Sequence, residues 1–278
     1  RLGKIFPICR NDLTMLAEKA HMPSVGPYTQ FPFGQGGQHQ YTFYLQGGLD
    51  TQIAVLAKRS AETLVSKGPA FVFFQQDGGF EANAKKAVEY LYENKVAQVS
   101  LIPFQAGESR RLADFIDLAK NPNPFLVFLG AAGELVNILS QPLDETQIPH
   151  VFLPEYFVTS DILKLSADTA RQLEMAYINV PDSNQGTALS DFRQFMRRHK
   201  LDHDYLTLRL FAYSASRTLI EGVKRSGKRI TRDQLVSEIE NMYGFEAGLN
   251  KPLNFGSRRR TGILGAYVVK LDSESGRL

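Results

Sequence analysis

The sequence predicts an α/β protein of two lobes, in which parallel sheets are flanked by helices. The main observation is a set of short apolar runs in the middle of the chain, whose starts are 25 to 28 residues apart. Each run is too short for a helix, and a stretch with apolar residues at helical spacing follows it. The runs are Ala70–Gln75, Gln98–Pro103, Pro124–Leu129, His150–Leu153 and Met175–Ile178.

This spacing is typical of repeated βα units. A strand that returns parallel to its neighbour needs a crossover long enough for a helix, and such strands are buried on both faces. Burial on both faces explains the runs FVFF (71–74) and FLVFL (125–129), which do not alternate with polar residues. We expect helices over 81–94, 109–120 and 132–140, and a broken helix over 160–173.

The segment before these runs predicts three strands and two helices. The strands are expected at Ile5–Cys9, Pro23–Pro27 and Tyr41–Leu45. The first helix, capped by Asn11 or Asp12, has apolar residues on one face, and the second ends before the Gly68-Pro69 pair. Those apolar residues are Leu13, Leu16, Ala17 and Ala20 in the first helix, and Ile53, Leu56, Ala57, Ala61 and Leu64 in the second.

The segment after these runs changes from alternating elements to helices alone. Three helices are expected between Thr187 and Asn241, and Thr231-Arg-Asp-Gln234 is a capping-box pattern that starts the last one. Strands follow at 252–255 and 265–271, joined by a basic turn at 256–262. A helical stretch between two β stretches indicates that the chain leaves one lobe and returns.

The simplest topology therefore has three crossings between two lobes. We expect residues 1–67 and 181–249 to form the first lobe, and residues 68–180 and 250–278 to form the second. The hinge would then lie near Ser66–Pro69, Val180–Ser183 and Ala247–Lys251.

Composition narrows the function class. The chain has 278 residues, of which 43% are hydrophobic and 22% charged, values typical of globular proteins. A net charge of +3 is too balanced to favour a nucleic-acid partner. No stretch approaches the roughly 20 apolar residues that a membrane-spanning helix needs.

Enzyme signatures are missing from the sequence. It contains no G-x-S-x-G elbow, Walker A loop or dinucleotide fingerprint, and Gly78-Gly79 comes closest to a phosphate loop. His199, Asp202 and His203 are the best candidates for metal ligands, but their segment is better explained as a helix junction. We therefore predict no catalytic residue, no metal site and no cofactor.

The loops at the carboxyl ends of the parallel strands are the expected ligand site, because open α/β sheets bind ligands there. They combine aromatic rings, amides and a few charges, which suits a small polar molecule. Glu155 is the most informative residue, since a carboxylate beside Tyr156 and Phe157 would gain a role from an amine on the ligand. A solvated loop glutamate is the alternative. The loops are Arg10–Asp12, Tyr28–Gln30, Gln75–Phe80, Gly130–Gly133 and Pro154–Phe157.

These loops and several longer stretches resemble the type 1 periplasmic solute-binding proteins, especially the class that serves branched-chain amino-acid ABC transporters. The resemblance covers nearly the whole chain and implies two α/β lobes that close around a ligand without chemistry. Its best stretches are 17–30 (AEKAHMPSVGPYTQ), 68–91 (GPAFVFFQQDGGFEANAKKAVEYL), 124–139 (PFLVFLGAAGELVNIL) and 231–272, which begins TRDQLVSEIENMYGFEAGLNKPLNFG.

In the first lobe, the resemblance implies ligand contacts in two loops. Arg10 and Asn11 stand where hydroxyl residues often hold an amino-acid carboxylate, and an arginine could bond a carboxylate through two nitrogens. Tyr28, Thr29 and Gln30 match the second contact loop of the family.

In the second lobe, the resemblance implies that Glu155 takes the ligand's ammonium group. Phe80 replaces the usual tyrosine, so the ring is kept and its hydroxyl is lost, and Ala132 replaces a larger contact residue. Gln76 and Tyr156 complete the expected ligand-binding set. The pocket is therefore expected to be related to that of the family, with its ligand changed.

The resemblance also implies that the first lobe is incomplete. Family members begin with further βα units, and this chain starts at the equivalent of their third strand. Cys9 falls where some relatives place one half of a disulfide. We accordingly expect a fragment, or a first lobe completed by another chain.

The function that follows is an extracytoplasmic solute-binding protein. It would capture an amino acid or a related small polar molecule and deliver it to the membrane component of an ABC transporter, in the periplasm or outside the cell. The signal or lipoprotein segment would lie outside this chain. One alternative is a receptor or regulator domain of the same fold, and an α/β enzyme is another, because fold does not fix function.

Overall fold

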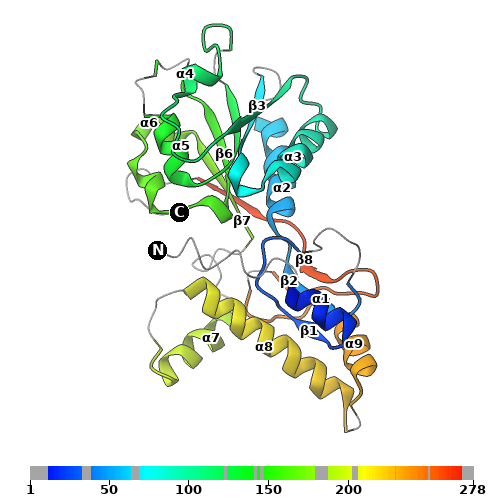
Figure 1. The fold of residues 1–278 in the computed structure, drawn as a ribbon. Helices are drawn as coiled ribbons and strands as arrows, with labels where there is room; N and C mark the ends of the chain where they lie inside the picture. Colours follow the sequence, from blue (N-terminus) through cyan, green and yellow to red (C-terminus); the bar gives the residue numbers. More distant parts are fainter. Residues whose placement is uncertain are drawn as a thin grey trace. The chain divides into compact units, whose positions relative to one another are not determined.

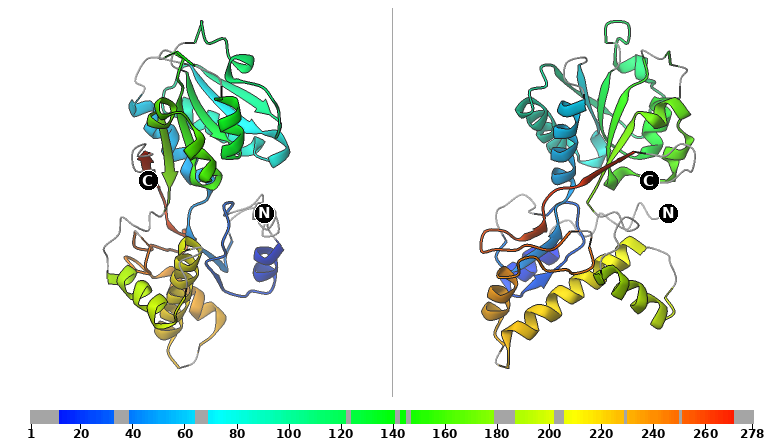
Figure 2. Two further views of the ribbon diagram at one scale, coloured as in Figure 1. Left: turned by 90° about the vertical axis from the view of Figure 1, so that its left-hand side faces the viewer. Right: turned by 180° about the vertical axis from the view of Figure 1, so that it is seen from behind.

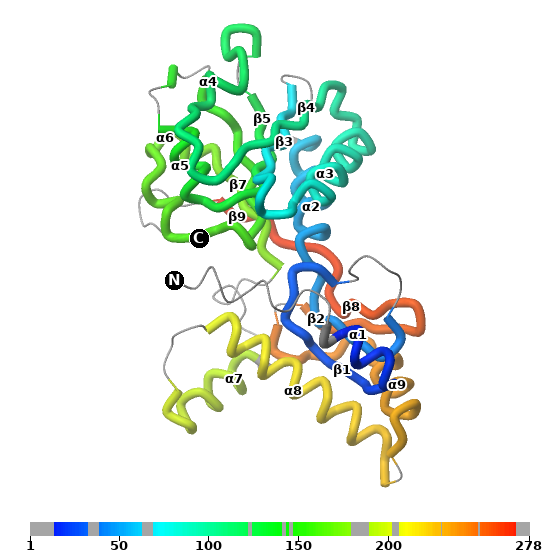
Figure 3. The backbone as a smooth tube through the Cα atoms, viewed as in Figure 1, coloured from blue at the N-terminus to red at the C-terminus, as the bar shows by residue number. Residues whose placement is uncertain are grey.

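The computed structural model describes residues 12–32, 39–63, 69–121, 124–140, 143–144, 147–178, 187–201, 206–228, 230–249 and 251–270 (Figure 1). The chain forms two compact units. Unit 1 consists of Arg1–Gly48 and Ile178–Gly265, and unit 2 consists of Leu49–Tyr177 and Ala266–Leu278. The chain therefore passes between the units after Gly48, Tyr177 and Gly265, and its path can be followed in Figure 3.

Unit 2 contains a six-stranded sheet in the order β4-β3-β5-β6-β7-β9. All neighbouring pairs are parallel except β7 and β9, which are antiparallel. The five predicted runs are confirmed as β3 to β7, with ends shifted by no more than two residues. The strands are β3 (Ala70–Gln75), β4 (Val99–Phe104), β5 (Phe125–Leu129), β6 (His150–Pro154), β7 (Leu173–Tyr177) and β9 (Tyr267–Lys270).

Helices cover both faces of this sheet (Figures 1 and 2). On one face, α2 packs against α3 and also contacts β6 and β7, while α5 and α6 lie on the other. The helices are α2 (Leu49–Thr63), α3 (Glu81–Glu93), α4 (Leu112–Phe115), α5 (Ala132–Ile138) and α6 (Ala167–Arg171), with 3-10 turns η3 (Gln76–Gly78), η4 (Glu155–Phe157) and η5 (Ser160–Lys164).

The core of unit 2 is built from the phenylalanines of the apolar runs. The Phe128 ring stacks on Phe104 at 5.1 Å and on Phe73 at 6.3 Å, measured between ring centroids. Phe125 meets Phe152 edge to face at 5.0 Å. Every residue of β5 is buried, which is why this strand shows no polar alternation.

Unit 1 contains a three-stranded parallel sheet in the order β1-β2-β8, and the long helix α8 contacts β1, β2 and α9. The predicted cap at Thr231 is confirmed, because its Oγ1 accepts a hydrogen bond from the Gln234 amide at 3.2 Å. The elements are α1 (Asp12–Lys19), β1 (Ser24–Val25), β2 (Thr42–Gln46), α7 (Thr187–Arg198), α8 (Leu206–Ser226), α9 (Arg232–Glu240) and β8 (Thr261–Ile263).

The boundaries of the units differ from the expected lobes in three segments, the shortest of which arises because unit 1 resumes at Ile178 rather than at residue 181. The helix α2 belongs to unit 2 rather than to the first lobe, because it packs on β6, β7 and α3. Residues 250–265 belong to unit 1, because β8 pairs with β2. The expected hinge segments Ser66–Pro69 and Ala247–Lys251 are wrong, because the chain passes between the units after Gly48 and Gly265. The expected hinge segment Val180–Ser183 and the expected strand at Ile5–Cys9 lie outside the described residues.

Three expected elements also differ in detail. The helix predicted over 109–120 is helical only in α4, since Ile116 has an extended backbone. The predicted turn at 256–262 is shorter, because Thr261 and Gly262 belong to β8. At 252–255 there is no named strand but an isolated bridge between Phe245 and Leu253.

The helix α1 does not bury the face expected for it, since Leu16 is 59% exposed. Its attachment is polar instead. The Glu18 carboxylate accepts hydrogen bonds from the backbone amides of Gln40 and Tyr41 and from Thr42 Oγ1. These bonds orient the helix more strongly than its short apolar face does.

None of the helices in the described part of the chain is both long and apolar enough to cross a membrane.

Candidate functional site

Five of the predicted ligand-binding residues lie together at the carboxyl edge of the unit 2 sheet. They directly follow the strands β3, β5 and β6, which are parallel neighbours and therefore end at the same edge. Gln76 begins η3 and Phe80 precedes α3. Ala132 begins α5, and Glu155 and Tyr156 belong to η4.

Glycines allow the first two of these loops to pack closely. A Cβ atom on Gly78 would lie 2.3 Å from the Phe80 ring, and one on Gly130 would lie 2.5 Å from the Phe104 ring. Neither contact is sterically acceptable, so a side chain at either position would displace an aromatic ring of the edge. The Gln75 Oε1 atom also accepts a long hydrogen bond of 3.5 Å from the Ala131 amide, which joins the loops after β3 and β5.

Three aromatic rings pack against one another at this edge of the sheet. Phe80 contacts Phe157 edge to face at 4.9 Å and Tyr156 at 6.0 Å, and Tyr156 meets Phe157 at 5.0 Å. Phe80 and Phe157 are 7% and 4% exposed, whereas Tyr156 is 37% exposed. Two of the rings are therefore core residues, and Tyr156 is the one that offers an aromatic surface to a ligand.

Glu155 is an acidic residue of this edge, and it is only partly exposed, whereas Asp77 of η3 is exposed. The charge of Glu155 affects the pKa of Tyr177, the last residue of the neighbouring strand β7. Burial, and secondly the Glu155 carboxylate, raise the pKa of the Tyr177 phenol, so this hydroxyl stays protonated at physiological pH. Tyr177 was not among the predicted site residues, although the last residue of a parallel strand is a position where such an edge residue is expected.

The predicted residues of unit 1 lie in the loop that follows β1. The Tyr28 ring packs edge to face on Phe211 of α8 at 5.1 Å, and Thr29 Oγ1 accepts a hydrogen bond from the Phe31 amide at 3.0 Å. The Gln30 carbonyl oxygen lies so close to Gly48 that a Cβ atom there would be 2.0 Å from it. The loop is thus held by one hydrogen bond of its own and by packing against α8 and Gly48.

Arg10 and Asn11, the expected carboxylate partners, lie outside the described residues. In unit 2 the structure therefore brings five predicted residues together at one edge: Gln76, Phe80, Ala132, Glu155 and Tyr156. In unit 1 it groups Tyr28, Thr29 and Gln30 in one loop.

Comparisons with known proteins assign the chain to a family and a fold. The model of the family described as "Periplasmic binding protein" matches residues 9–277. No curated protein sequence matches the chain.

Solved structures show the same fold. A leucine-binding protein from Thermotoga maritima is 16% identical, with a TM-score of 0.69 over 94% of this chain and 73% of that one. A branched-chain amino-acid ABC transporter protein from Thermus thermophilus with bound valine is 17% identical, with a TM-score of 0.68 over 95% and 72%. A fatty-acid ABC transporter substrate-binding protein from Thermomonospora curvata is 13% identical, with a TM-score of 0.64 over 94% and 68%.

The similarity to these solved structures indicates the type 1 periplasmic-binding-protein fold, as predicted. The family model, which spans most of the chain, adds the assignment of a family. The chain belongs to the periplasmic binding protein family.

Proposed function

We propose that this protein is an extracytoplasmic solute-binding protein that captures an amino acid, or a closely related small molecule, for an ABC transporter. The observation that carries the proposal is the position of Glu155. It lies at the carboxyl edge of a parallel sheet, next to the exposed Tyr156 ring. In proteins of this architecture ligands bind at that edge, and no catalytic constellation is needed for binding.

Glu155 favours a ligand that carries a positive charge. A partly buried carboxylate loses hydration, and an ammonium group would compensate it through a charge-assisted hydrogen bond. Tyr156 would contact the apolar part of the same ligand, because its ring is flanked by Phe80 and Phe157. A neutral or purely acidic ligand would use the ring but not the carboxylate.

The test compares two probes that differ in one group. L-leucine carries an ammonium group, whereas 4-methylpentanoate has the same carbon skeleton and lacks it. We expect L-leucine to bind the unmodified protein in calorimetric titration. In Glu155→Gln its affinity should fall by at least about thirtyfold, since removing one partner of a buried charge pair costs about 2 kcal/mol or more.

The matched control is Glu81→Gln, which removes an exposed carboxylate of α3 that forms an ion pair with Lys85 one turn along the same helix. This variant should bind L-leucine as the unmodified protein does. If Glu155→Gln keeps its affinity for L-leucine, or if 4-methylpentanoate binds as tightly as L-leucine, the ammonium role of Glu155 is wrong.

A further inference from the structure

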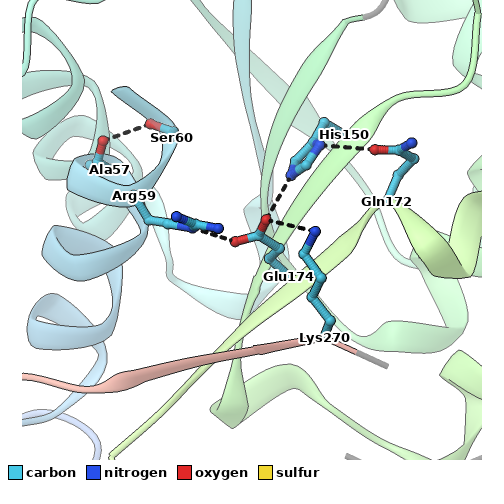
Figure 4. Close-up of polar contacts among 7 residues, drawn as sticks. All are labelled: Ala57, Arg59, Ser60, His150, Gln172, Glu174 and Lys270. Carbon is cyan, nitrogen blue, oxygen red and sulfur yellow. Dashed lines mark hydrogen bonds and ion pairs between the residues drawn. The ribbon is translucent and has the colours of Figure 1, made fainter. Parts of the chain in front are cut away.

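A buried carboxylate lies at the centre of a charged cluster in unit 2 (Figure 4). The cluster involves the amino-terminal ends of β6 and β7, whereas the proposed ligand residues follow the carboxyl ends of their strands. The side chain of Glu174, on β7, is 0% exposed. Its Oε2 atom accepts a hydrogen bond from Arg59 Nε of α2 at 2.9 Å. Its Oε1 atom lies 3.5 Å from Lys270 Nζ of β9 and 3.4 Å from His150 Nε2 of β6.

Three of these elements adjoin the places where the chain passes between the units. The helix α2 begins at Leu49, directly after the first passage, and β7 ends at Tyr177, directly before the second. The strand β9 begins at Tyr267, one residue after unit 2 resumes at Ala266. One carboxylate thus contacts or belongs to each of these three elements. The contacts lie toward the ends away from the passages, with Arg59 late in α2, Glu174 early in β7 and Lys270 last in β9.

The two oxygens of the Glu174 carboxylate contact different elements of unit 2. In the antiparallel pair of β7 and β9, Glu174 stands opposite Lys270 in the strand register. Arg59 approaches the same carboxylate from the helix layer through the other oxygen, as Figure 4 shows. The two oxygens therefore hold a helix and a strand to β7 at the same time, which an apolar side chain cannot do.

The charge of Glu174 needs its partners for stabilisation more than the charges of Arg59 and Lys270 need Glu174, because the three side chains differ in burial. Arg59 and Lys270 have side chains that are 40% and 57% exposed, so water can solvate either of them alone. Glu174 has no access to water. Because buried ion pairs can often be replaced by apolar residues without loss of stability, stability alone does not explain a carboxylate at this position.

We propose that Glu174 is a positioning residue that ties together α2, β7 and β9, the three elements of unit 2 that continue into the passages. With Glu174 in place, these three elements move as one body when a ligand is captured. Without it, their ends around the carboxylate loosen from one another. This role goes beyond the ligand contact proposed for Glu155 and does not depend on which molecule is bound.

The test measures amide hydrogen exchange by mass spectrometry, with no ligand added. The segments to compare are 57–61, 173–176 and 268–270, which surround the three contacts. We expect Glu174→Gln to increase exchange in all three by about tenfold or more, because local opening there becomes easier. Exchange in α3 and β5 should stay unchanged.

A second variant separates positioning from stability. Glu174→Leu keeps the volume of the side chain and is expected to keep the melting temperature within a few degrees, yet it should increase exchange in the same three segments. The matched control is Asp168→Asn, which breaks an exposed ion pair with Arg171 and should change none of the three.

Three outcomes would overturn the proposal: no increase in either Glu174 variant, an increase confined to one or two segments, or a uniform increase throughout unit 2. Because no ligand is present, failure here leaves amino-acid binding unaffected. Conversely, a failed titration with L-leucine would leave the exchange result standing.

Discussion

Arg59 Nε donates a 2.9 Å hydrogen bond to Glu174 Oε2, and this bond joins residues that are 115 positions apart in the sequence. It connects a half-exposed helix residue to a fully buried strand residue. Burial alone would raise the pKa of Glu174, but the bond and charge of Arg59, helped by His150 and Lys270, lower it. The carboxylate is therefore charged at neutral pH, and its contacts with Arg59 and Lys270 are ionic.

The first prediction concerns the energy of this pair. We expect Arg59→Met to lower the free energy of unfolding by about 2 kcal/mol, less than the loss of a partner in a fully buried pair because Arg59 reaches solvent. The double variant with Glu174→Leu should regain most of the loss, since no buried charge remains. Urea unfolding measures both values. Equal stability of the single and double variants would contradict the ionic interpretation.

The second prediction concerns pH. Burial lowers the pKa of His150, although Glu174 and the Gln172 side chain act in the opposite direction and Lys270 adds to the lowering. The unfolded chain takes up a proton at this histidine below about pH 6.5, while the folded chain resists it, so stability falls as the pH drops below that value.

Melting temperatures measured between about pH 7.5 and 5.5 test this sign. The substitution His150→Gln removes the titrating group, and we expect it to flatten the decline over this range. Glu174 contributes in a separate and more acidic range, because its pKa is lowered from the ordinary carboxyl value. Parallel curves for the two proteins would show that His150 does not titrate in this way.

The third prediction concerns the glycine after β5. In Gly130→Ala the new methyl group would meet the Phe104 ring at 2.5 Å, so we expect a loss of about 1–3 kcal/mol of stability from overpacking. Gly133→Ala is the matched control, because its nearest contact is 3.5 Å away and it lies in α5, where alanine is the better helix former. Equal stability of the two variants would show that a methyl group at position 130 does not clash with the Phe104 ring.

The fourth prediction concerns the start of α9. Removing the Thr231 hydroxyl in Thr231→Ala leaves the Gln234 amide without its capping bond, which should cost about 1 kcal/mol. Thr231→Ser keeps the hydroxyl and should retain the stability of the unmodified protein in thermal unfolding. A loss of the same size in both would assign the effect to the lost methyl group instead.

Much of the unit 2 fold could be predicted, because local patterns specify it. Buried parallel strands produce unbroken apolar runs, and β3 and β5 are found at the predicted places. The cap at Thr231 depends on residues three positions apart, which is also local information.

The charged cluster could not be predicted, because its partners are distant in the sequence. Glu174 immediately precedes the apolar run that we identified, and nothing near it indicates that Arg59 or Lys270 will reach it. The exposed face of α1 was missed for a related reason. Its position depends on the bonds of Glu18 to Tyr41 and Thr42, more than twenty residues away.

The sequence predicted which loops form the candidate site, but not how their side chains pack against one another. The rule that ligands bind at the carboxyl ends of parallel strands selected the loop of Glu155 correctly as an edge loop. It did not reveal that Phe80 would be buried as a core ring, or that Tyr177 would lie within the electrostatic influence of Glu155. Both depend on packing between neighbouring loops.

The most direct test of the central claim is equilibrium dialysis of the protein against a mixture of isotopically labelled amino acids, followed by chemical analysis of what is retained. We predict saturable retention of at least one amino acid, recovered unchanged, and a melting temperature that rises with its concentration because it binds only the folded state. Retention of none of them, or recovery of a chemically altered product, would contradict the account.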